Sequence, residues 1–368
     1  MDQATRLPLG SWLPNTTPRP QRDRRSTSPR HVQASALVGR TRAAWPISEA
    51  VMASLQRSAA LSQNAAWGYA YGQSDHLVGL ARRAAGEHWS FLAPALAVEQ
   101  SLARVQDGPL SDATRRAVVA TLAQQLPRTL DRSLPRSILE LYPRALAVLA
   151  RFLEDGSLYD EDLFAKDIRF VTGATVPAGA QAVDVLFSSS PASHLARLRR
   201  TTATVGRLIR AGETDRVYDL LVRGGGDWLQ IHTDIRDVSE FSPDGWDRCY
   251  RRIGDLLVDR PKLAGLLGIS WFYDPQLSAI SPRLNYLRDR PLRNGAFLVR
   301  LRPNAVDAER AAAASPTRRR LIADGAYTPV CHALFWPRRE LLRWHMSQAP
   351  LSDTLRPNRL QDEPVAQE

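Results

Sequence analysis

The chain has 368 residues and is 44% hydrophobic, which is enough for two packed domains and excludes a wholly disordered protein. Its formal net charge is +11, and Lys166 and Lys262 are the only lysines among 49 basic residues, which leaves 47 arginines. This balance favours an anionic partner. The arginines are nevertheless spread among aspartates and glutamates, and the aromatic residues form no RNA-binding pattern, so we do not expect nucleic-acid binding.

Cysteine content and hydropathy indicate a cytoplasmic protein. Cys249 and Cys331 are the only cysteines, too few for a disulfide framework and not spaced as a zinc-binding pair. The N-terminal residues lack the apolar segment of a signal peptide, and no uncharged apolar run reaches the roughly 18 residues that suggest a membrane span. We therefore expect a protein of the reducing cytosol without a transmembrane helix.

The N-terminal part is predicted to be a disordered tail followed by a helical domain. Residues 1–35 combine prolines with serine and many arginines, a mixture that cannot bury enough apolar surface to offset its ordering entropy. Residues 36–165 repeat apolar residues near a 3.6-residue period, which predicts a helical bundle. Helices are predicted from Ser48, over His76–His88, over Ser111–Gln125 with Ser111 or Asp112 as its cap, and over Ser137–Leu153, with Trp67, Tyr69 and Tyr71 in an extended segment or loop.

A change of pattern near Lys166 marks the predicted boundary of a second domain, residues 166–346. β-Branched residues predict strands at Ile168–Thr172 and Ala182–Phe187. A very basic helix is predicted over residues 191–211, and the glycine run at 224–226 is interpreted as a helix C-cap and turn. Residues 347–368 are predicted to form a flexible tail.

Strands and helices alternate in the rest of the second domain. Ser242 precedes a proline and starts an amphipathic helix that ends near Asp259. Further helices are predicted to start at Ser281, Ser315 and Arg338. Strands are predicted at Trp228–Ile235, Lys262–Ile269, Gly295–Arg302 and Tyr327–Trp336. The sequence therefore predicts an α+β fold, with an N-terminal helical bundle followed by a mixed α/β sheet domain that has helices between its strands.

His232 and Asp234 are the leading candidates for chemistry. They share one face of the strand predicted at 228–235, about 7 Å apart by the rise per residue. In one interpretation His232 is a general base that is oriented or held charged by Asp234 or Asp237. In another, His232, Asp234 and His332 hold Fe(II); His332 lies 100 residues after His232, a spacing that resembles the 2-oxoglutarate oxygenases. In a third, His232 and Asp234 are a buried hydrogen-bonded pair in a non-catalytic binding module.

Two resemblances concern residues 166–346. The segments HTDIRDVSEFSPDGWDRCYRRI and SWFYDPQLSAISPRLNYL resemble a group of bacterial proteins known only as uncharacterised, which implies no activity. The order of strands and helices after Trp228 resembles the C-terminal half of the GNAT family of N-acetyltransferases. That resemblance implies a central strand with the catalytic base, a loop and helix N-terminus that hold the coenzyme A pyrophosphate, and a next strand that splays away to admit the acyl chain.

The acetyltransferase resemblance also implies roles for individual residues. His232 would be the base, Asp234 its orienting partner and Tyr273 the acid, in a position that fits the family only roughly. The loop 236–245 departs from the family pattern R/Q-x-x-G-x-G/A, because its only glycine is Gly245 and its three carboxylates would repel phosphates. Residues at this loop that would contact acyl-CoA are Arg236, Asp244, Gly245 and Trp246.

The leading functional hypothesis is therefore an acyltransferase-like enzyme that transfers an acyl group from acyl-CoA to an amine or hydroxyl of a small molecule. A metal-dependent oxygenase that uses Fe(II) and 2-oxoglutarate is the first alternative. A non-catalytic binding module is the second.

Overall fold

The computed structural model describes residues 47–60, 62, 64–87, 90–106, 108–156, 159–186, 202, 204–210, 227–234, 236, 238–303, 305–313 and 315–348. All of these belong to one compact unit, Ala44–Glu368. The predicted tail 1–35, most of the basic helix predicted at 191–211, the glycine run and residues 349–368 lie outside the described residues.

Helices and one mixed six-stranded sheet confirm the α+β class. The strand order is β1-β2-β3-β4-β6-β5. Among these described strands, β3 and β4 are the parallel pair, and the other neighbours are antiparallel. The strands are β1 (Thr175–Pro177), β2 (Ala182–Asp184), β3 (Asp227–His232), β4 (Leu263–Ser270), β5 (Phe297–Arg300) and β6 (His332–Pro337).

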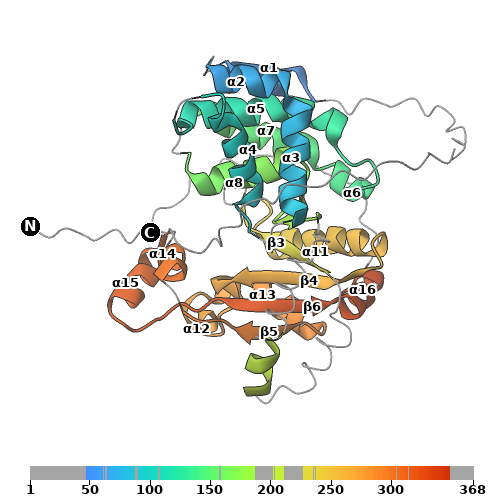
Figure 1. Ribbon diagram of the computed structural model, residues 1–368. Helices are drawn as coiled ribbons and strands as arrows, with labels where there is room; N and C mark the ends of the chain where they lie inside the picture. The colour runs from blue at the N-terminus through green and yellow to red at the C-terminus, as the bar shows by residue number, and fades with distance from the viewer. Residues whose placement is uncertain are drawn as a thin grey trace, which may run out of the picture. The chain divides into compact units, whose positions relative to one another are not determined.

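The described N-terminal part is helical, as predicted, and its helices pack around one apolar core (Figure 1). Ser111 caps α5, because its hydroxyl accepts a hydrogen bond from the Thr114 backbone N–H at 3.2 Å. The helices are α1 (Glu49–Ala59), α2 (Ala65–Gly72), α3 (Ser74–Glu87), α4 (Ala93–Ala103), α5 (Asp112–Thr129), α6 (Arg136–Leu139), α7 (Tyr142–Glu154) and α8 (Glu161–Val171).

Three local predictions in this region were wrong. The helix predicted at Ser137–Leu153 is divided into α6 and α7, because Pro143 starts a new helix in the first turn of α7 instead of bending one helix. The aromatic residues of 67–71 lie in α2, which Asn64 caps. The strand predicted at Ile168–Thr172 is the end of α8: Asp160 caps this helix, and its buried residues recur every three or four positions, a pattern that outweighs β-propensity.

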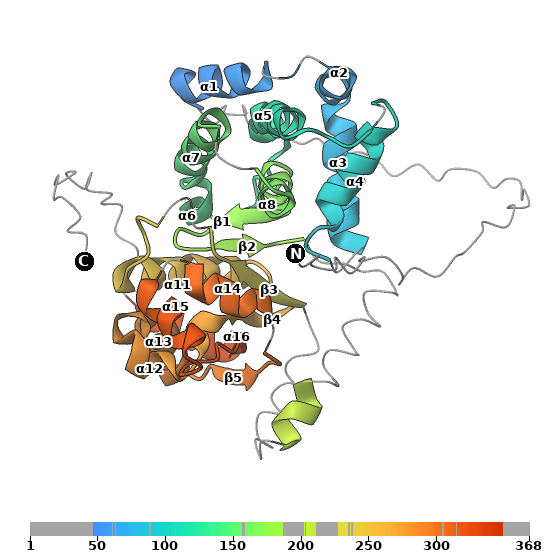
Figure 2. The same ribbon diagram turned by 90° about the vertical axis from the view of Figure 1, so that its left-hand side faces the viewer.

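Lys166, where the change of pattern was placed, lies in the middle of α8. Gly173 follows this helix with φ +71°, a left-handed conformation that favours glycine, and the chain then turns into β1. Figure 2 shows α8 directly beside β1, with β2 next to it. Helix α8 therefore connects the helical part to the sheet.

The sheet is covered on both faces at its centre. On one face, α11, α13 and α16 pack together against residues such as Ile231, Leu266 and Trp336. On the other face, Leu208, from the helical residues 204–210, packs with Leu267 and other apolar residues of β5 and β6. The remaining helical elements are α11 (Pro243–Val258), η2 (Trp271–Tyr273), α12 (Leu277–Ile280), η3 (Pro282–Leu284), α13 (Tyr286–Arg293), α14 (Ala305–Ala313), α15 (Pro316–Ala323) and α16 (Arg338–Ser347).

The predicted alternation of strands and helices after Trp228 is confirmed. Ser242 caps α11 by accepting a hydrogen bond from the Gly245 backbone N–H at 3.2 Å. Helix α11 crosses from β3 to β4, which makes these strands parallel neighbours, as a strand–helix–strand connection does. The strand predicted at Trp228–Ile235 ends at His232, so Asp234 lies beyond it and does not share the strand face that was predicted for it. The strand predicted at Gly295–Arg302 covers only Phe297–Arg300, and Tyr327–Cys331 precede the ladder of β6, which starts at His332.

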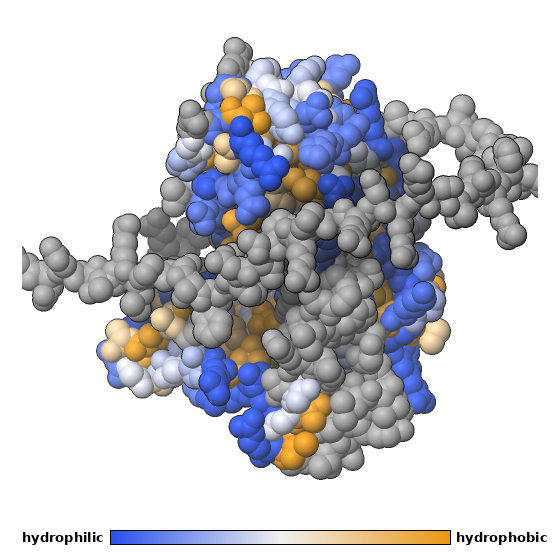
Figure 3. Space-filling view, in the orientation of Figure 1, coloured by the Kyte–Doolittle hydropathy of each residue, from blue (hydrophilic) through white to orange (hydrophobic). Residues whose placement is uncertain are grey.

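Several large apolar side chains are exposed among the described residues. In Figure 3 hydrophilic side chains separate small hydrophobic areas over the coloured part of the visible face. The exposed large apolar side chains are far apart in the sequence, for example Tyr71, Val238 and Met346. No described helix combines the length and the hydropathy that crossing a membrane requires.

Candidate functional site

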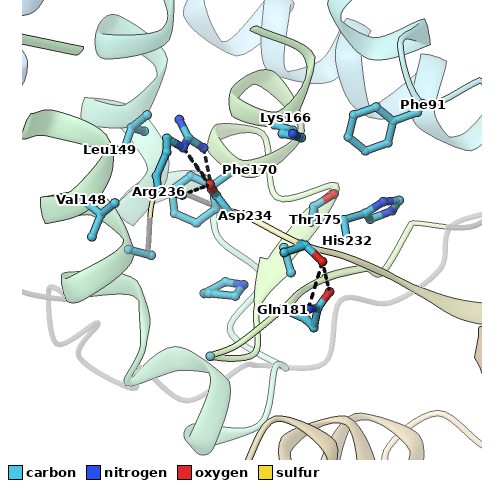
Figure 4. Close-up of a pocket in the computed structure, with 15 residues that line it drawn as sticks. Phe91, Val148, Leu149, Lys166, Phe170, Thr175, Gln181, His232, Asp234 and Arg236 are labelled. Atoms are coloured by element: carbon cyan, nitrogen blue, oxygen red, sulfur yellow. Dashed lines mark hydrogen bonds and ion pairs between the residues drawn. The ribbon is translucent and has the colours of Figure 1, made fainter. Parts of the chain in front are cut away.

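A pocket lies where α7 and α8 meet strands β1, β2 and β3 (Figure 4). Its volume is about 110 Å³, somewhat smaller than a cavity of about 150 Å³ that holds benzene. Apolar side chains form much of the wall, among them Phe91, Val148, Leu149, Phe170, Pro177 and Ala182. The polar and charged side chains that line it are Lys166, Thr175, Gln181, His232, Thr233, Asp234 and Arg236.

His232 stands at the end of β3 and is bound to a carboxylate of the neighbouring strand β2. Its Nε2 lies 2.9 Å from Oδ2 of Asp184. Thr175 donates a hydrogen bond of 2.7 Å to the other carboxylate oxygen, and Arg169 forms an ion pair of 2.8 Å with that same oxygen. The register of β2 and β3, with Ala182 opposite His232, holds these side chains at one place on the sheet.

The charge of Asp184 determines which nitrogen of His232 faces it as a hydrogen-bond donor. Burial alone raises the pKa of the Asp184 carboxyl, but His232 and Arg169 together outweigh burial and hold that pKa well below its usual range. An ionised carboxylate only accepts hydrogen bonds, so Nε2 of His232 must be the donor. In the neutral imidazole the lone pair then resides on Nδ1. The centroid of the His232 ring lies 4.8 Å from that of Phe91, and the Arg169 guanidinium lies over the Phe91 ring at 4.9 Å.

An Asp184→Asn variant is expected to lose stability at neutral pH and to approach the wild type in acid. Because the pKa of Asp184 is lower in the folded than in the unfolded protein, its ionised form contributes stability fully above the unfolded pKa of about 4. That contribution is lost as the pH falls through the folded-state pKa. Urea unfolding between pH 3 and pH 7 measures the difference in free energy of unfolding. A difference that grows on acidification would contradict the assignment.

The second charged cluster on the wall joins Asp234, Arg236 and Asp167. The Arg236 guanidinium donates to both oxygens of Asp234, with Nε at 2.9 Å from Oδ1 and Nη2 at 2.6 Å from Oδ2. It also contacts the completely buried Asp167 of α8 through Nη1 at 3.0 Å. Tyr159 donates a hydrogen bond of 2.8 Å to Asp167. Asp234 is therefore bound to Arg236, whereas Asp184 orients His232.

Tyr273 lies away from this pocket. It is only 2% exposed, and its ring packs on Gly268, where an added Cβ would meet both Tyr273 and Ile231. Ile231 and Gly268 are partners across β3 and β4 and so share a face, while His232, the next residue of β3, points to the opposite face. The structure thus brings His232 and Asp234 together at one pocket and leaves Tyr273 on the other side of the sheet.

His332 is also separated from His232. It begins β6, pairs with Ser270 of β4, and its Nδ1 lies 3.1 Å from the Val330 carbonyl oxygen. It does not line the pocket. Among the described residues, no three or more His, Cys, Asp or Glu side chains are grouped so that they could hold a metal ion. His232, Asp234 and His332 therefore do not form a common metal site.

The four residues proposed for acyl-CoA are in different surroundings. Arg236 is paired with two carboxylates, and Trp246 is a core residue that is 1% exposed. Asp244 lies in the first turn of α11, and Gly245 packs so tightly against the Glu240 carbonyl oxygen that a Cβ would overlap it. Glu240, which precedes this helix, is buried. Its carboxylate oxygens lie 3.4–3.8 Å from side-chain nitrogens of Arg144, Arg248 and Arg252.

The sequence interpretation missed Asp184, Arg169, Lys166 and Phe91. The one available signal for Asp184 was a single carboxylate within the short apolar strand AVDVLF. No local signal in the sequence indicates that Lys166 and Arg169 lie at the pocket. The strand predicted at Ile168–Thr172 also hides the fact that both residues belong to one helix, α8. Their role depends on β1 folding back against α8, a contact that only the tertiary structure determines.

Comparison with known proteins adds no family to this description. No protein-family model matches the chain, and no curated protein or solved structure matches it. The fold and the site define an α+β protein with a small, largely apolar pocket and a carboxylate-bound histidine on its wall.

Proposed function

We propose that the protein is an acyltransferase-like enzyme that uses His232 as the general base for an amine or hydroxyl acceptor held in the pocket. The observation that carries the proposal is the contact of 2.9 Å between His232 Nε2 and Asp184 Oδ2 at the pocket wall. A carboxylate that fixes the tautomer and supports the positive charge of a histidine is a frequent arrangement for a general base.

The position of His232 in the sheet supports the same proposal. It is the last residue of β3, one position beyond the last pair of the parallel ladder, Ile231 with Gly268. Strand β4 continues to Ser270, so the chain after His232 no longer pairs with it. A base at the end of a central strand beside the next parallel strand agrees with the acetyltransferase resemblance of this part of the chain.

The proposed step is a transfer of an acyl group from acyl-CoA, which supplies a thioester carbonyl and a thiolate leaving group. The acceptor's nitrogen or oxygen bonds to the carbonyl carbon, and its proton passes to Nδ1 of His232. The carbon–sulfur bond breaks, and the proton then passes from His232 to the departing thiolate. Asp184 stabilises the imidazolium between these transfers. We assign Tyr273 no step, because it lies on the opposite face of the sheet.

The N-terminus of α11 fits a pyrophosphate only in part. Its backbone N–H groups and the partly exposed Arg144 and Arg248 favour an anion. Asp244 adds negative charge in the first turn of this helix, and Arg144 and Arg248 already contact the Glu240 carboxylate. We therefore derive no contact between this helix and the acyl donor.

A His232→Gln variant is expected to lower the acyl-transfer rate by about 10²–10⁴-fold, the usual contribution of a general base. The assay measures thiol release from acetyl-CoA with a panel of small amines and alcohols. His76→Gln is the matched control, because His76 is exposed on α3, far from the pocket. Thermal melts check that both variants fold. No thiol release with any acceptor, or an unchanged rate in His232→Gln, would contradict the proposal.

A non-catalytic ligand-binding role is the second candidate. The observation that favours it is that Asp184, Asp234 and Arg236 are already satisfied by one another and by neighbouring groups. Such networks rigidify a binding site without providing a reactive group. Under this role, small ligands raise the melting temperature of the protein, and acetyl-CoA produces no turnover.

A further inference from the structure

Lys166 is a charged residue of the pocket for which the proposed reaction step has no use. Its side chain comes from α8 and forms part of the pocket lining, together with Phe170, Thr175 and His232 (Figure 4). The helical spacing places Asp162 and Phe170 on its side of α8, one turn away in each direction. It is one of two lysines in a chain with 47 arginines.

Lys166 has two carboxylates near it among the described residues, Asp162 and Asp234. Its Nζ lies 3.7 Å from Oδ2 of Asp162, which is itself 46% exposed and also lies 3.5 Å from Arg310. The Asp234 carboxylate, on the same pocket wall, is bound by two nitrogens of Arg236. The Lys166 side chain is 27% exposed, and an ion pair with a half-exposed carboxylate at this distance contributes little free energy. The ammonium is therefore the cationic group of this wall that is most available to a ligand.

We propose that the acceptor is a small apolar amino acid or hydroxy acid whose carboxylate binds Lys166. This inference rests on the proposed function, because it assigns the acceptor's amine or hydroxyl to His232. The apolar wall formed by Phe91, Leu149 and Phe170 then receives the side chain. A volume of about 110 Å³, set against the roughly 150 Å³ that holds benzene, suits a short branched side chain.

Lysine fits this role better than arginine would. Its ammonium is a compact charge on a thin flexible stem, whereas a guanidinium is planar and larger and would fill more of a small pocket. The Arg236 guanidinium in the same pocket binds both oxygens of Asp234 and lies over the Phe152 ring at 5.0 Å. These contacts hold the guanidinium in one position, so it is less free than the Lys166 ammonium to bind a ligand.

Binding of L-valine and of L-valinamide to the full chain tests the inference by titration calorimetry. L-Valinamide carries an uncharged carboxamide where L-valine carries the carboxylate, and the two probes share the same side chain and α-amine. We expect the wild type to bind L-valine about tenfold or more tightly than L-valinamide, the usual effect of a hydrogen bond between charged groups. In Lys166→Met this ratio falls to near one. Lys262→Met, which removes the exposed lysine before β4, is the matched control and keeps the wild-type ratio.

The outcomes separate this inference from the proposed function. Selective binding of L-valine that depends on Lys166, without thiol release from acetyl-CoA, supports recognition of the carboxylate and contradicts the acyltransferase proposal. Thiol release with amines that lack a carboxylate, at equal rates in the wild type and Lys166→Met, overturns the ligand class and leaves the acyl transfer. Equal binding of the two probes by the wild type also overturns the ligand class. Thermal melts of both variants exclude a folding defect.

Discussion

An Arg236→Met variant is expected to lose about 3–5 kcal/mol of its free energy of unfolding, the range for removing one partner of a buried ion pair. Arg236 has an 11% exposed side chain and contacts Asp167, whose side chain is 1% exposed, and the pocket residue Asp234. Methionine fills similar space but offers no donor. The variant therefore leaves the Asp167 carboxylate buried with Tyr159 as its remaining side-chain donor.

The electrostatics of Asp167 explain the size of this effect. Burial raises the pKa of Asp167 even with Arg236 and Tyr159 beside it. Without Arg236 the carboxylate must either remain charged in the interior or take up a proton, and both cost free energy. Adding Asp167→Asn to the Arg236→Met variant removes that charge and is expected to recover part of the loss. The effects of the two substitutions on the free energy of unfolding are therefore not additive, as expected for residues in contact.

Chemical denaturation followed by circular dichroism measures these differences. Arg57→Met is the matched control, because Arg57 is 65% exposed and forms its ion pair with Glu154 on the surface. That change should cost about 1 kcal/mol or less. A loss in Arg236→Met no larger than in Arg57→Met would show that the cluster around Asp167 does not stabilise the fold.

A Gly265→Ala variant is expected to cost about 3 kcal/mol or more, since backbone strain and overpacking contribute about 1–3 kcal/mol each. Gly265 lies in β4 at the point where the register with β3 shifts, and its φ is +150°. A Cβ there would overlap the Trp336 carbonyl oxygen and approach the Arg338 nitrogen and the Trp228 ring to 2.8 Å. Two of these neighbours are backbone atoms, one in β6 and one at the start of α16, and the β6 atom cannot move without disturbing the β4–β6 ladder.

Gly68→Ala provides the opposite case. Gly68 lies in the helix α2, and a Cβ added there meets no atom within 4 Å. Alanine in a helix is favoured over glycine by about 0.5–1 kcal/mol, so this variant should be slightly more stable than the wild type. Thermal unfolding of the two variants side by side checks the contrast. Equal stabilities of Gly265→Ala and the wild type would show that the β4–β6 pair can relax around a methyl group.

Local signals in the sequence account for most of the predicted elements. Residue type and position predict Ser242 as a cap and leave Ser111 or Asp112 as the cap of α5; both serines accept the expected backbone hydrogen bond. The alternation predicted for Trp228–Ile235 is confirmed as far as His232, with Leu229 and Ile231 buried, but β3 ends at His232, so Asp234 lies beyond the strand. These features depend on residues within one turn or one strand, so the chain needs no long-range contact to specify them.

The error at α8 shows where local signals conflict. The segment KDIRFVT has the β-branched residues of a strand, yet it continues a helix that Asp160 starts. The apolar residues Phe164, Ile168 and Val171 of this helix face the helical core. Their burial decides the conformation of the segment. Without the contact between α8 and β1, the roles of Lys166 and Arg169 at the pocket could not be predicted.

The sequence by itself determined the α+β class, the element order after Trp228 and the choice of His232 as a candidate base, because hydrophobic period, caps and strand alternation are local properties. The tertiary structure decided the partners of that histidine. Asp184 is 48 residues from His232 in the chain and meets it through the antiparallel pairing of β2 and β3. The same packing paired Asp234 with Arg236 and put Tyr273 on the opposite face of the sheet, since side-chain contacts across strands depend on register and burial.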